Sequence, residues 1–299
     1  MSTKIDDELF GSADLQWEKL KNKLFLGICF TASLFGVVVL VFLLADVAYE
    51  AGIGIVEFDI NIGQFLTEGG RRDPEDAGFY AAIVASVWLM ALTAVMAFVV
   101  GVGSAIYLEE YAPDTRITRL IEANLANLAG VPSVVYGLLV LAAVVNGFGT
   151  GSILLAGAIA LALLIVPIII VSTQEALRAV PDGLRNGSYA TGATQWQTIR
   201  QVVLPAAIPG ILTGTILALA RAIGETAPLI MVGILFTARR PPGPLDSFSA
   251  MPSQIYVWAA QPQPHFHHLA ALGIVVLLAF MLTMNAVAVF LRNRYEREL

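Results

Sequence analysis

Residues Ala123 to Gln174 read ANLANLAGVPSVVYGLLVLAAVVNGFGTGSILLAGAIALALLIVPIIIVSTQ. This stretch contains no Asp, Glu, Lys or Arg, and it is much longer than the roughly 20 apolar residues that a helix needs to cross a bilayer. Between Asn146 and Ser152, three glycines and several small polar residues favour a tight turn. We therefore predict two membrane-spanning helices joined by this turn.

Four further stretches are long and apolar enough to span a membrane. They are Leu24–Ala45, Ala77–Leu108 (with the helix beginning near Ala81), Ala206–Phe236 and Leu269–Leu291. Of all residues 57% are hydrophobic and 13% are charged, whereas soluble domains contain about 25% charged residues. The sequence thus predicts an all-α polytopic membrane protein with six transmembrane helices and argues against a soluble enzyme.

The distribution of basic residues predicts the orientation of these helices. Of the 17 Lys and Arg residues, 12 flank the predicted spans on one side, 4 flank them on the other, and Arg221 lies within a span. Because cytoplasmic loops are enriched in Lys and Arg, we expect both termini in the cytoplasm. We expect the first span to be retained, because its apolar stretch is too long for a signal peptide and no cleavage site follows it.

The connections on the opposite side are long. Asp46–Tyr80 carries eight acidic residues and 237–268 is rich in proline, which suits either a solvated outer surface or a docking surface for an extracytoplasmic partner. We divide the chain into an N-terminal part (1–76), a core (77–291) with a cytoplasmic loop (174–205) and an outer loop (237–268), and a C-terminal tail (292–299).

Several classes of partner and chemistry are excluded. The formal net charge of −6 argues against a nucleic acid partner. Cys29 is the only cysteine, so no intrachain disulfide or cysteine zinc cluster can form. The histidines at 265, 267 and 268 have no acidic residue near them in sequence, and we expect no metal, no cofactor and no catalytic residue.

The predicted cytoplasmic loop has the pattern of two short helices. Pro181 is well placed to open the first, and Gly192 suits a left-handed cap at its end. Thr194 and Gln197 form the capping-box pattern of a second helix, which we expect to end at Pro205. Such a pair can lie on lipid or can dock into a groove on a cytoplasmic protein.

This loop resembles the EAA loop of ABC importer permeases, in which Glu-Ala-Ala precedes a glycine and a later Leu-Pro. The glycine matches Gly192 and the Leu-Pro matches Leu204 and Pro205, whereas Asn186-Gly187-Ser188 replaces the opening triplet. The resemblance implies that the loop contacts an ATPase subunit. It places the contact at Ser188, Tyr189, Ala190, Gly192, Ala193, Trp196, Leu204 and Pro205.

Longer segments resemble the permeases of phosphate ABC importers, and among them the PstA-type subunit. These segments are 107–113, 127–133, 175–181, 192–199 and 221–229, and the resemblance covers roughly Ala81–Leu291. It implies the type I ABC importer permease fold with cytoplasmic coupling helices, in the plasma membrane of a prokaryote. It also implies a second, homologous permease, a cytoplasmic ATPase dimer, an extracytoplasmic phosphate-binding protein and phosphate as the substrate.

Arg221 and Glu225 are unusual because both fall within a predicted span, where each charge costs about 2.5–3.5 kcal/mol. At positions i and i+4 they share one helix face, and Pro228 would leave the carbonyl of Gly224 without a donor. Gly210 and Gly214 lie on the same face, within about 60° of Arg221, and their G-x-x-x-G spacing predicts that another helix approaches closely there. The pair is either a structural ion pair or part of an anion path. We expect the path to include Arg221, Gly224, Glu225, Thr226, Pro228, Asn127 and Ser133, although the last two can equally serve helix packing.

The sequence contains no G-x-x-x-x-G-K-[S/T] phosphate loop, so ATP hydrolysis is expected from a partner. We therefore expect a transporter subunit and not an enzyme. Two alternatives stay open: a permease for another oxyanion such as sulfate or molybdate, and an ATP-independent anion channel or carrier.

Overall fold

The computed structural model describes residues 12–71, 73–233 and 240–298, which form helices and loops without a β-strand. The chain divides into two units, Met1–Glu50 and Ala51–Leu299. The first unit consists of most of helix α2 (Ser12–Val56), whose stretch Trp17–Val56 is long and apolar enough to cross a membrane. The predicted first span is therefore confirmed, although the helix extends beyond it at both ends.

The second unit is a helical bundle built around α4 (Tyr80–Ile106) and α7 (Leu154–Arg178), which pack along each other. A Cβ atom on Gly101 of α4 would lie only 2.7 Å from Ile169 of α7, so the glycine permits this close approach. The helices α10 (Leu204–Ile223) and α13 (Pro264–Glu298) pack on the same core. Helices α4, α7 and α13 confirm the predicted second, fourth and sixth spans.

The predicted third span is not one straight helix. Its residues form α5 (Arg116–Leu128), then α6 (Ser133–Val140) with a π-helical continuation η3 (Leu141–Asn146), and the two parts meet at 106°. Pro132 explains the bend, because the residue before a proline disfavours the helical conformation. The second part is about 20 Å long at 1.5 Å per residue, which is shorter than the roughly 30 Å hydrocarbon core. The described residues thus contain five continuous candidate spans, or six if the bent pair counts as one.

A fifth candidate span is present, but it covers Gln195–Ile223 and so begins and ends earlier than the predicted Ala206–Phe236. α10 ends at Ile223, and a separate short helix α11 (Ala227–Val232) follows after three residues. The end of the predicted span, residues 234–236, lies outside the described residues.

At its other end α10 continues back through a π-helical turn η4 (Ile199–Val203) to α9 (Gln195–Thr198). Pro205 therefore does not end a separate helix. It lies in the first turn after a segment that already departs from the regular hydrogen-bond pattern, where its missing N–H group matters little.

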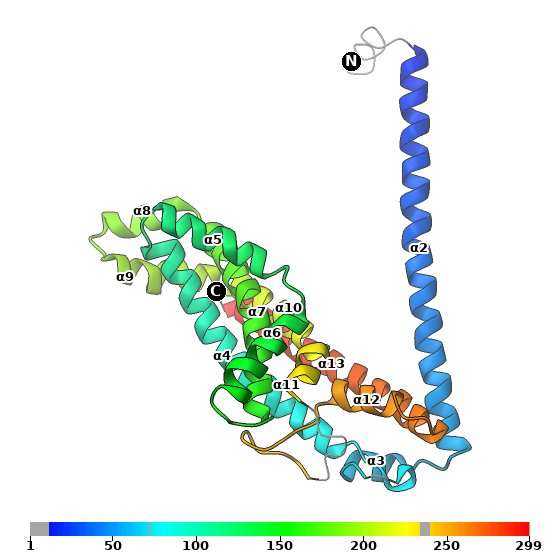
Figure 1. The fold of residues 1–299 in the computed structure, drawn as a ribbon. Helices are drawn as coiled ribbons and strands as arrows, with labels where there is room; N and C mark the ends of the chain where they lie inside the picture. The colour runs from blue at the N-terminus through cyan, green and yellow to red at the C-terminus, as the bar shows by residue number, and fades with distance from the viewer. Residues whose placement is uncertain (1–11, 72, 234–239, 299) are drawn as a thin grey trace. The chain divides into compact units, whose positions relative to one another are not determined.

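The two long connections predicted on the outer side contain helices of their own. The first holds α3 (Ile62–Thr67) and the 3-10 turn η1 (Pro74–Asp76), and the second holds α12 (Met251–Ala259). They share one core, in which the rings of Phe65, Phe79 and Trp258 lie 5.3–5.9 Å apart and are almost fully buried. In the second unit, α3 and α12 lie at the opposite end from α8 (Asp182–Ala190) and α9 (Figure 1).

Candidate functional site

The break between α10 and α11 carries the charged pair. Arg221 lies in the last turn of α10, and the N–H group of Glu225 donates to the carbonyl of Ala222 (3.2 Å) as the helix ends. Thr226 precedes α11, and Pro228 falls in its first turn, where no N–H donor is needed. The expectation that Pro228 frees a carbonyl within a continuous helix was therefore wrong, because the helix has already ended.

The two charges form a loose, accessible pair. Nε of Arg221 lies 3.6 Å from Oε1 of Glu225, and the side chains are 46% and 20% exposed. A guanidinium has five N–H donors, so a single contact at this distance leaves most of them available for another partner. Paired N–H groups of this kind match the oxygens of phosphate or a carboxylate. Chemically, the break can hold an oxyanion at Arg221 beside a competing carboxylate.

Helix α6 supports the break from one side. A Cβ atom on Gly137 would lie 2.7 Å from both Cα and the carbonyl oxygen of Pro228, so α6 and α11 touch through backbone at this point. One residue earlier, the hydroxyl of Tyr136 donates to the carbonyl of Leu128 (2.9 Å) and fixes the corner between α5 and α6. Tyr136 also packs in the same core cluster as Ala222.

The remaining members of the predicted path are placed differently. Asn127 is exposed near the end of α5, and its carbonyl accepts from the N–H group of Gly130 (3.0 Å), whereas the half-buried Ser133 begins α6. Within the described ranges, no hydrogen bond or ion pair joins either residue to Arg221. The structure thus brings together Arg221, Gly224, Glu225, Thr226 and Pro228, and it does not connect Asn127 or Ser133 to them directly.

The close approach predicted at Gly210 and Gly214 is confirmed. A Cβ atom on Gly210 would lie 2.7 Å from Cβ of Ala176, and one on Gly214 would overlap the side chain of Ser172. Both contacts are with α7, so the two glycines serve helix packing.

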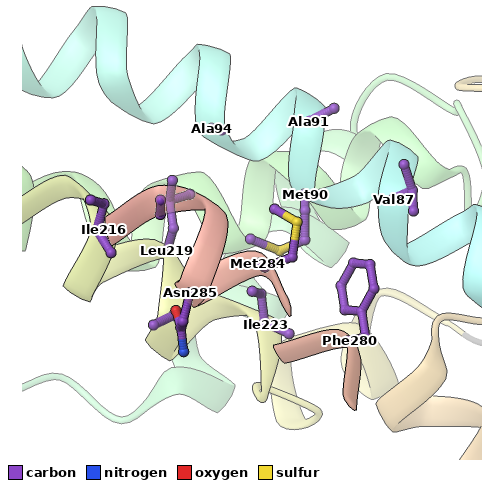
Figure 2. A pocket seen from close by; sticks show the side chains of 12 residues that line it. Val87, Met90, Ala91, Ala94, Ile216, Leu219, Ile223, Phe280, Met284 and Asn285 are labelled. Atoms are coloured by element: carbon purple, nitrogen blue, oxygen red, sulfur yellow. The ribbon is translucent and has the colours of Figure 1, made fainter. Parts of the chain in front are cut away.

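The apolar groove between α4, α10 and α13 does not suit an anion (Figure 2). It has a volume of about 220 Å³ and is lined by Val87, Met90, Ala91, Ala94, Ile216, Leu219, Ala220, Ile223, Phe280, Met284, Asn285 and Ala288. Asn285 supplies the only polar side chain, and an anion moved there would lose its hydration without charge compensation.

The coupling segment is the loop 174–205 that the sequence predicts to contact an ATPase, and it folds as expected as far as the start of α9. α8 follows Pro181, and Gly192 has the left-handed φ of +86°. Thr194 and Gln197 form both bonds of the capping box that opens α9. The hydroxyl groups of Ser188 and Thr198, 2.9 Å apart, link the two arms.

The residues predicted to contact an ATPase fall into two groups. Tyr189 and Trp196 are 45% and 55% exposed, Ala190 and Gly192 are exposed, and Leu184 adds a third large apolar side chain at 49%. In contrast, Leu204 packs against the core of Leu177, Val180 and Val203, and Ser188, Ala193 and Pro205 are half-buried. A docking protein can reach the first group, whereas the second shapes the segment.

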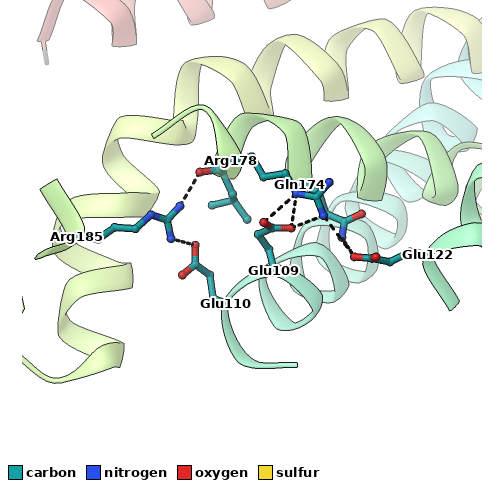
Figure 3. A network of polar contacts seen from close by, with 7 residues as sticks. Glu109, Glu110, Glu122, Gln174, Arg178 and Arg185 are labelled. Atoms are coloured by element: carbon teal, nitrogen blue, oxygen red, sulfur yellow. Dashed lines mark hydrogen bonds and ion pairs between the residues drawn. The ribbon is translucent and has the colours of Figure 1, made fainter. Parts of the chain in front are cut away.

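A network of ion pairs lies where the coupling segment meets the bundle (Figure 3). Glu109 and Glu110 belong to a π-helical turn η2 (Tyr107–Tyr111) that continues α4. Arg178 at the end of α7 donates from Nε to both carboxylate oxygens of Glu109 (2.9 Å each), and its Nη2 lies 3.4 Å from Glu122 of α5. Arg185 of α8 contacts Glu110 at 2.6 Å, and both side chains are largely buried.

Sequence reasoning did not identify this network. Arg178 and Arg185 were counted among the basic flanks that predict orientation, and Arg178, Glu109 and Glu110 lie in segments that support the family resemblance. A signal was present in the sequence: acidic residues follow the second predicted span and basic residues follow the fourth, on the same side of the membrane. Charges of opposite sign at neighbouring helix ends can pair.

A family model for the inner membrane component of binding-protein-dependent transport systems matches residues 97–299. The phosphate transport system permease protein PstA of Haemophilus influenzae is 32% identical over 90% of this chain and 93% of its own length. PstA of Mycobacterium leprae is 38% identical over 72% and 70%, respectively. A probable ABC transporter permease of Bacillus subtilis, YqgI, is 30% identical over 79% and 85%.

Two solved structures share the fold. A chain of a bacterial alginate ABC transporter superposes with a TM-score of 0.66 at 14% identity, over 91% of this chain and 95% of that one. A chain of the inward-facing MetNI methionine ABC transporter gives a TM-score of 0.60 at 19% identity, over 73% and 97%. The helices described above are therefore arranged as in the membrane subunits of ABC importers.

Proposed function

Because the chain belongs to the family of inner membrane components of binding-protein-dependent transport systems, we propose that it is the permease subunit of an ATP-driven importer of inorganic phosphate. The observation that supports this most directly is the half-exposed guanidinium of Arg221 beside Glu225 at a helix break. Several relatives that match most of the chain, among them those of H. influenzae and M. leprae, are named as phosphate transport permeases, and a guanidinium suits phosphate.

In this proposal Arg221 gives the anion a transient binding site. A guanidinium without a competing charge would hold a phosphate tightly in a low-dielectric site. The carboxylate of Glu225, 3.6 Å away, raises the energy of the bound state and thereby favours release. Gly224 has no side chain, and the space around it is open, because a Cβ atom at this position would meet nothing closer than 4.0 Å. The break therefore stays accessible.

The energy would come from a cytoplasmic ATPase dimer that docks on the coupling segment. Leu184 and Tyr189 of α8 and Trp196 of α9 are exposed apolar side chains, and a groove on a soluble subunit can bury such side chains. Closure of the ATPase would move this segment and change the side of the membrane from which Arg221 is reached.

A second permease would complete the path. Arg221 is too exposed in this single chain for a charge that lies between membrane faces, since an intramembrane ion normally faces a protein interior or a water-filled cavity. A homologous permease packed on this face would enclose it, and an extracytoplasmic phosphate-binding protein would deliver the anion. We place both termini and the coupling segment in the cytoplasm of the prokaryotic cell, as the basic flanks predict.

Reconstitution tests this function. The complex purified through this chain would be placed in liposomes with its binding protein, and labelled phosphate uptake would be measured with and without ATP. We expect an ATPase to co-purify and uptake to require ATP, with unlabelled phosphate competing better than sulfate or molybdate. Preferred uptake of sulfate or molybdate would contradict the substrate, and uptake without any ATPase would indicate a channel or carrier.

A further inference from the structure

The helix α8, on which the proposed ATPase contact depends, has few ways of holding on to the bundle. None of its residues is buried, so apolar packing does not fix it. Among the described residues, its side chains form hydrogen bonds with other elements at Arg185 and between Ser188 and Thr198 of α9. Besides its contacts with α9 and η4, α8 is thus linked to η2 and α7 through Arg185.

Arg185 reaches two membrane helices at once. Its Nη1 lies 2.6 Å from Oε1 of Glu110 at the end of α4, and its Nη2 donates to the carbonyl of Leu177 at the end of α7 (2.7 Å). The side chains of Arg185 and Glu110 are 19% and 7% exposed, so water screens the pair little. A guanidinium can hold both acceptors in one fixed geometry because its donors lie in a rigid plane.

The second arm of the coupling segment contacts the same residue. The side-chain amide of Gln195, the first residue of α9, donates to the backbone carbonyl of Glu110. Glu110 thus binds α8 through its carboxylate and α9 through its carbonyl. The neighbouring Glu109 binds Arg178 of α7, and Figure 3 shows the contacts of both carboxylates. The π-helical end of α4 is the point where both arms and α7 meet.

We propose that the Arg185–Glu110 pair is the joint that transmits movement of the coupling segment to α4 and α7, with both side chains acting as positioning residues for transport. This inference rests on the proposed ATP-driven function. Loss of the joint should leave the exposed ATPase-docking side chains in place and uncouple their movement from the break that contains Arg221.

The test uses a double variant that leaves no buried charge unpaired. Glu110→Leu combined with Arg185→Met replaces both charges by apolar side chains of similar size, which buried ion pairs often tolerate. Arg185→Lys is the second variant, because an ammonium keeps the charge but cannot hold both acceptors in the guanidinium geometry. Arg200→Gln is the matched control, because it removes an exposed charge from the same segment. Arg200 itself makes no ion pair within the described residues.

The readout is independent of the substrate. In a Cys29→Ser background, Gly224→Cys places a single thiol at the break, where the added side chain has open space. Each variant is assembled in the full complex. We then measure co-purification of the ATPase and labelling of this thiol by a membrane-impermeant maleimide, with and without ATP. Phosphate uptake per ATP hydrolysed is measured in parallel complexes that keep Gly224.

In the parent and in Arg200→Gln, we expect ATP to change the labelling rate at least fivefold. In the double variant we expect normal co-purification, no change of labelling with ATP, and at least tenfold less uptake per ATP. Arg185→Lys should fall between them. The proposal would be overturned if labelling in the double variant responded to ATP as it does in the parent. If the double variant does not assemble, the same response in Arg185→Lys would overturn it. A parent whose labelling does not respond to ATP would also overturn it. A parent that responds to ATP but takes up no phosphate would instead overturn the proposed substrate.

Discussion

Arg221 and Glu225 approach to 3.6 Å across the point where α10 ends, so the break between two helices and not a continuous helix face sets their geometry. An unwound segment gives the carboxylate freedom to move away from the guanidinium. Because both side chains are partly exposed, the pair is not sealed within the packed core of this chain. This geometry favours our proposal that its charges serve transport over a purely structural ion pair.

Replacement of Arg221 by Gln should abolish most phosphate uptake while the complex still assembles. Hydrogen bonds to charged groups contribute about 1.5–3 kcal/mol each, so loss of one strong contact predicts a decrease of about 10- to 100-fold. Uptake in liposomes and co-purification of the ATPase measure the two effects. Arg240→Gln, an exposed arginine beyond the break, is the matched control and should transport normally. Normal uptake by Arg221→Gln would exclude this residue from the path.

Replacement of Glu225 by Gln should have a different effect from loss of the arginine. Without the competing carboxylate, the guanidinium should hold phosphate more tightly and release it more slowly. We expect the phosphate concentration at half-maximal uptake to decrease together with the maximal rate. A higher half-maximal concentration would mean that Glu225 assists binding and does not limit it.

The apolar spans could be predicted from sequence because a bilayer imposes a length and a composition on any crossing helix. The positions at which a span bends could not be predicted in this way, because the effect of a proline on a helix depends on the residues around it. Pro167 lies inside the continuous helix α7, whereas Pro132 precedes the start of α6 after a sharp bend. At the end of α10, Gly224 at the cap and Pro228 in the first turn of α11 form a local stop pattern, which a prediction from span length alone does not use.

The ion-pair network was missed for a related reason. Arg178 and Glu109 are 69 residues apart, and Arg185 and Glu110 are 75 residues apart, so no helical spacing connects them. Only the packing of α4 against α7 brings these side chains together. In contrast, the turn at Gly192 and the capping box at Thr194 are local, and their residue types predicted them correctly.

Removal of the indole of Trp196 should weaken ATPase docking without unfolding the permease. The side chain is 55% exposed, so it contributes little to the core of this chain and is available to a partner. In interfaces, a buried tryptophan often accounts for more than about 2 kcal/mol, which corresponds to at least a tenfold weaker complex. Binding of the purified ATPase to Trp196→Ala in detergent would measure this. Tyr256→Ala, equally exposed on α12 at the other end of the second unit, should bind the ATPase normally.

Two glycines of the coupling segment should respond in opposite ways to alanine. Gly192 has a φ of +86°, which a residue with a Cβ atom adopts at a cost of roughly 1–2 kcal/mol, so Gly192→Ala should distort the turn and reduce uptake per ATP. Gly187 lies within α8 with open space around it, so Gly187→Ala should stabilise the helix by about 0.5–1 kcal/mol. Thermal unfolding and uptake assays on both variants test this, and equal behaviour would show that the left-handed turn has no role in coupling.

The contact between Gly137 and Pro228 should be the least tolerant point near the charged pair. An alanine at position 137 would place its Cβ atom 2.7 Å from the backbone of Pro228 and 2.9 Å from Cβ of Met231, so α6 and α11 would have to separate. Overpacking of this kind costs about 1–3 kcal/mol, and the displaced α11 begins two residues after Glu225. We therefore expect Gly137→Ala to lower both the unfolding temperature and phosphate uptake. Gly103 of α4 has nothing within 4 Å of a Cβ atom, so Gly103→Ala should leave both unchanged or slightly raise stability. If Gly137→Ala unfolded and transported like Gly103→Ala, α6 would not position the break, and the close packing of α6 on α11 would have no part in transport.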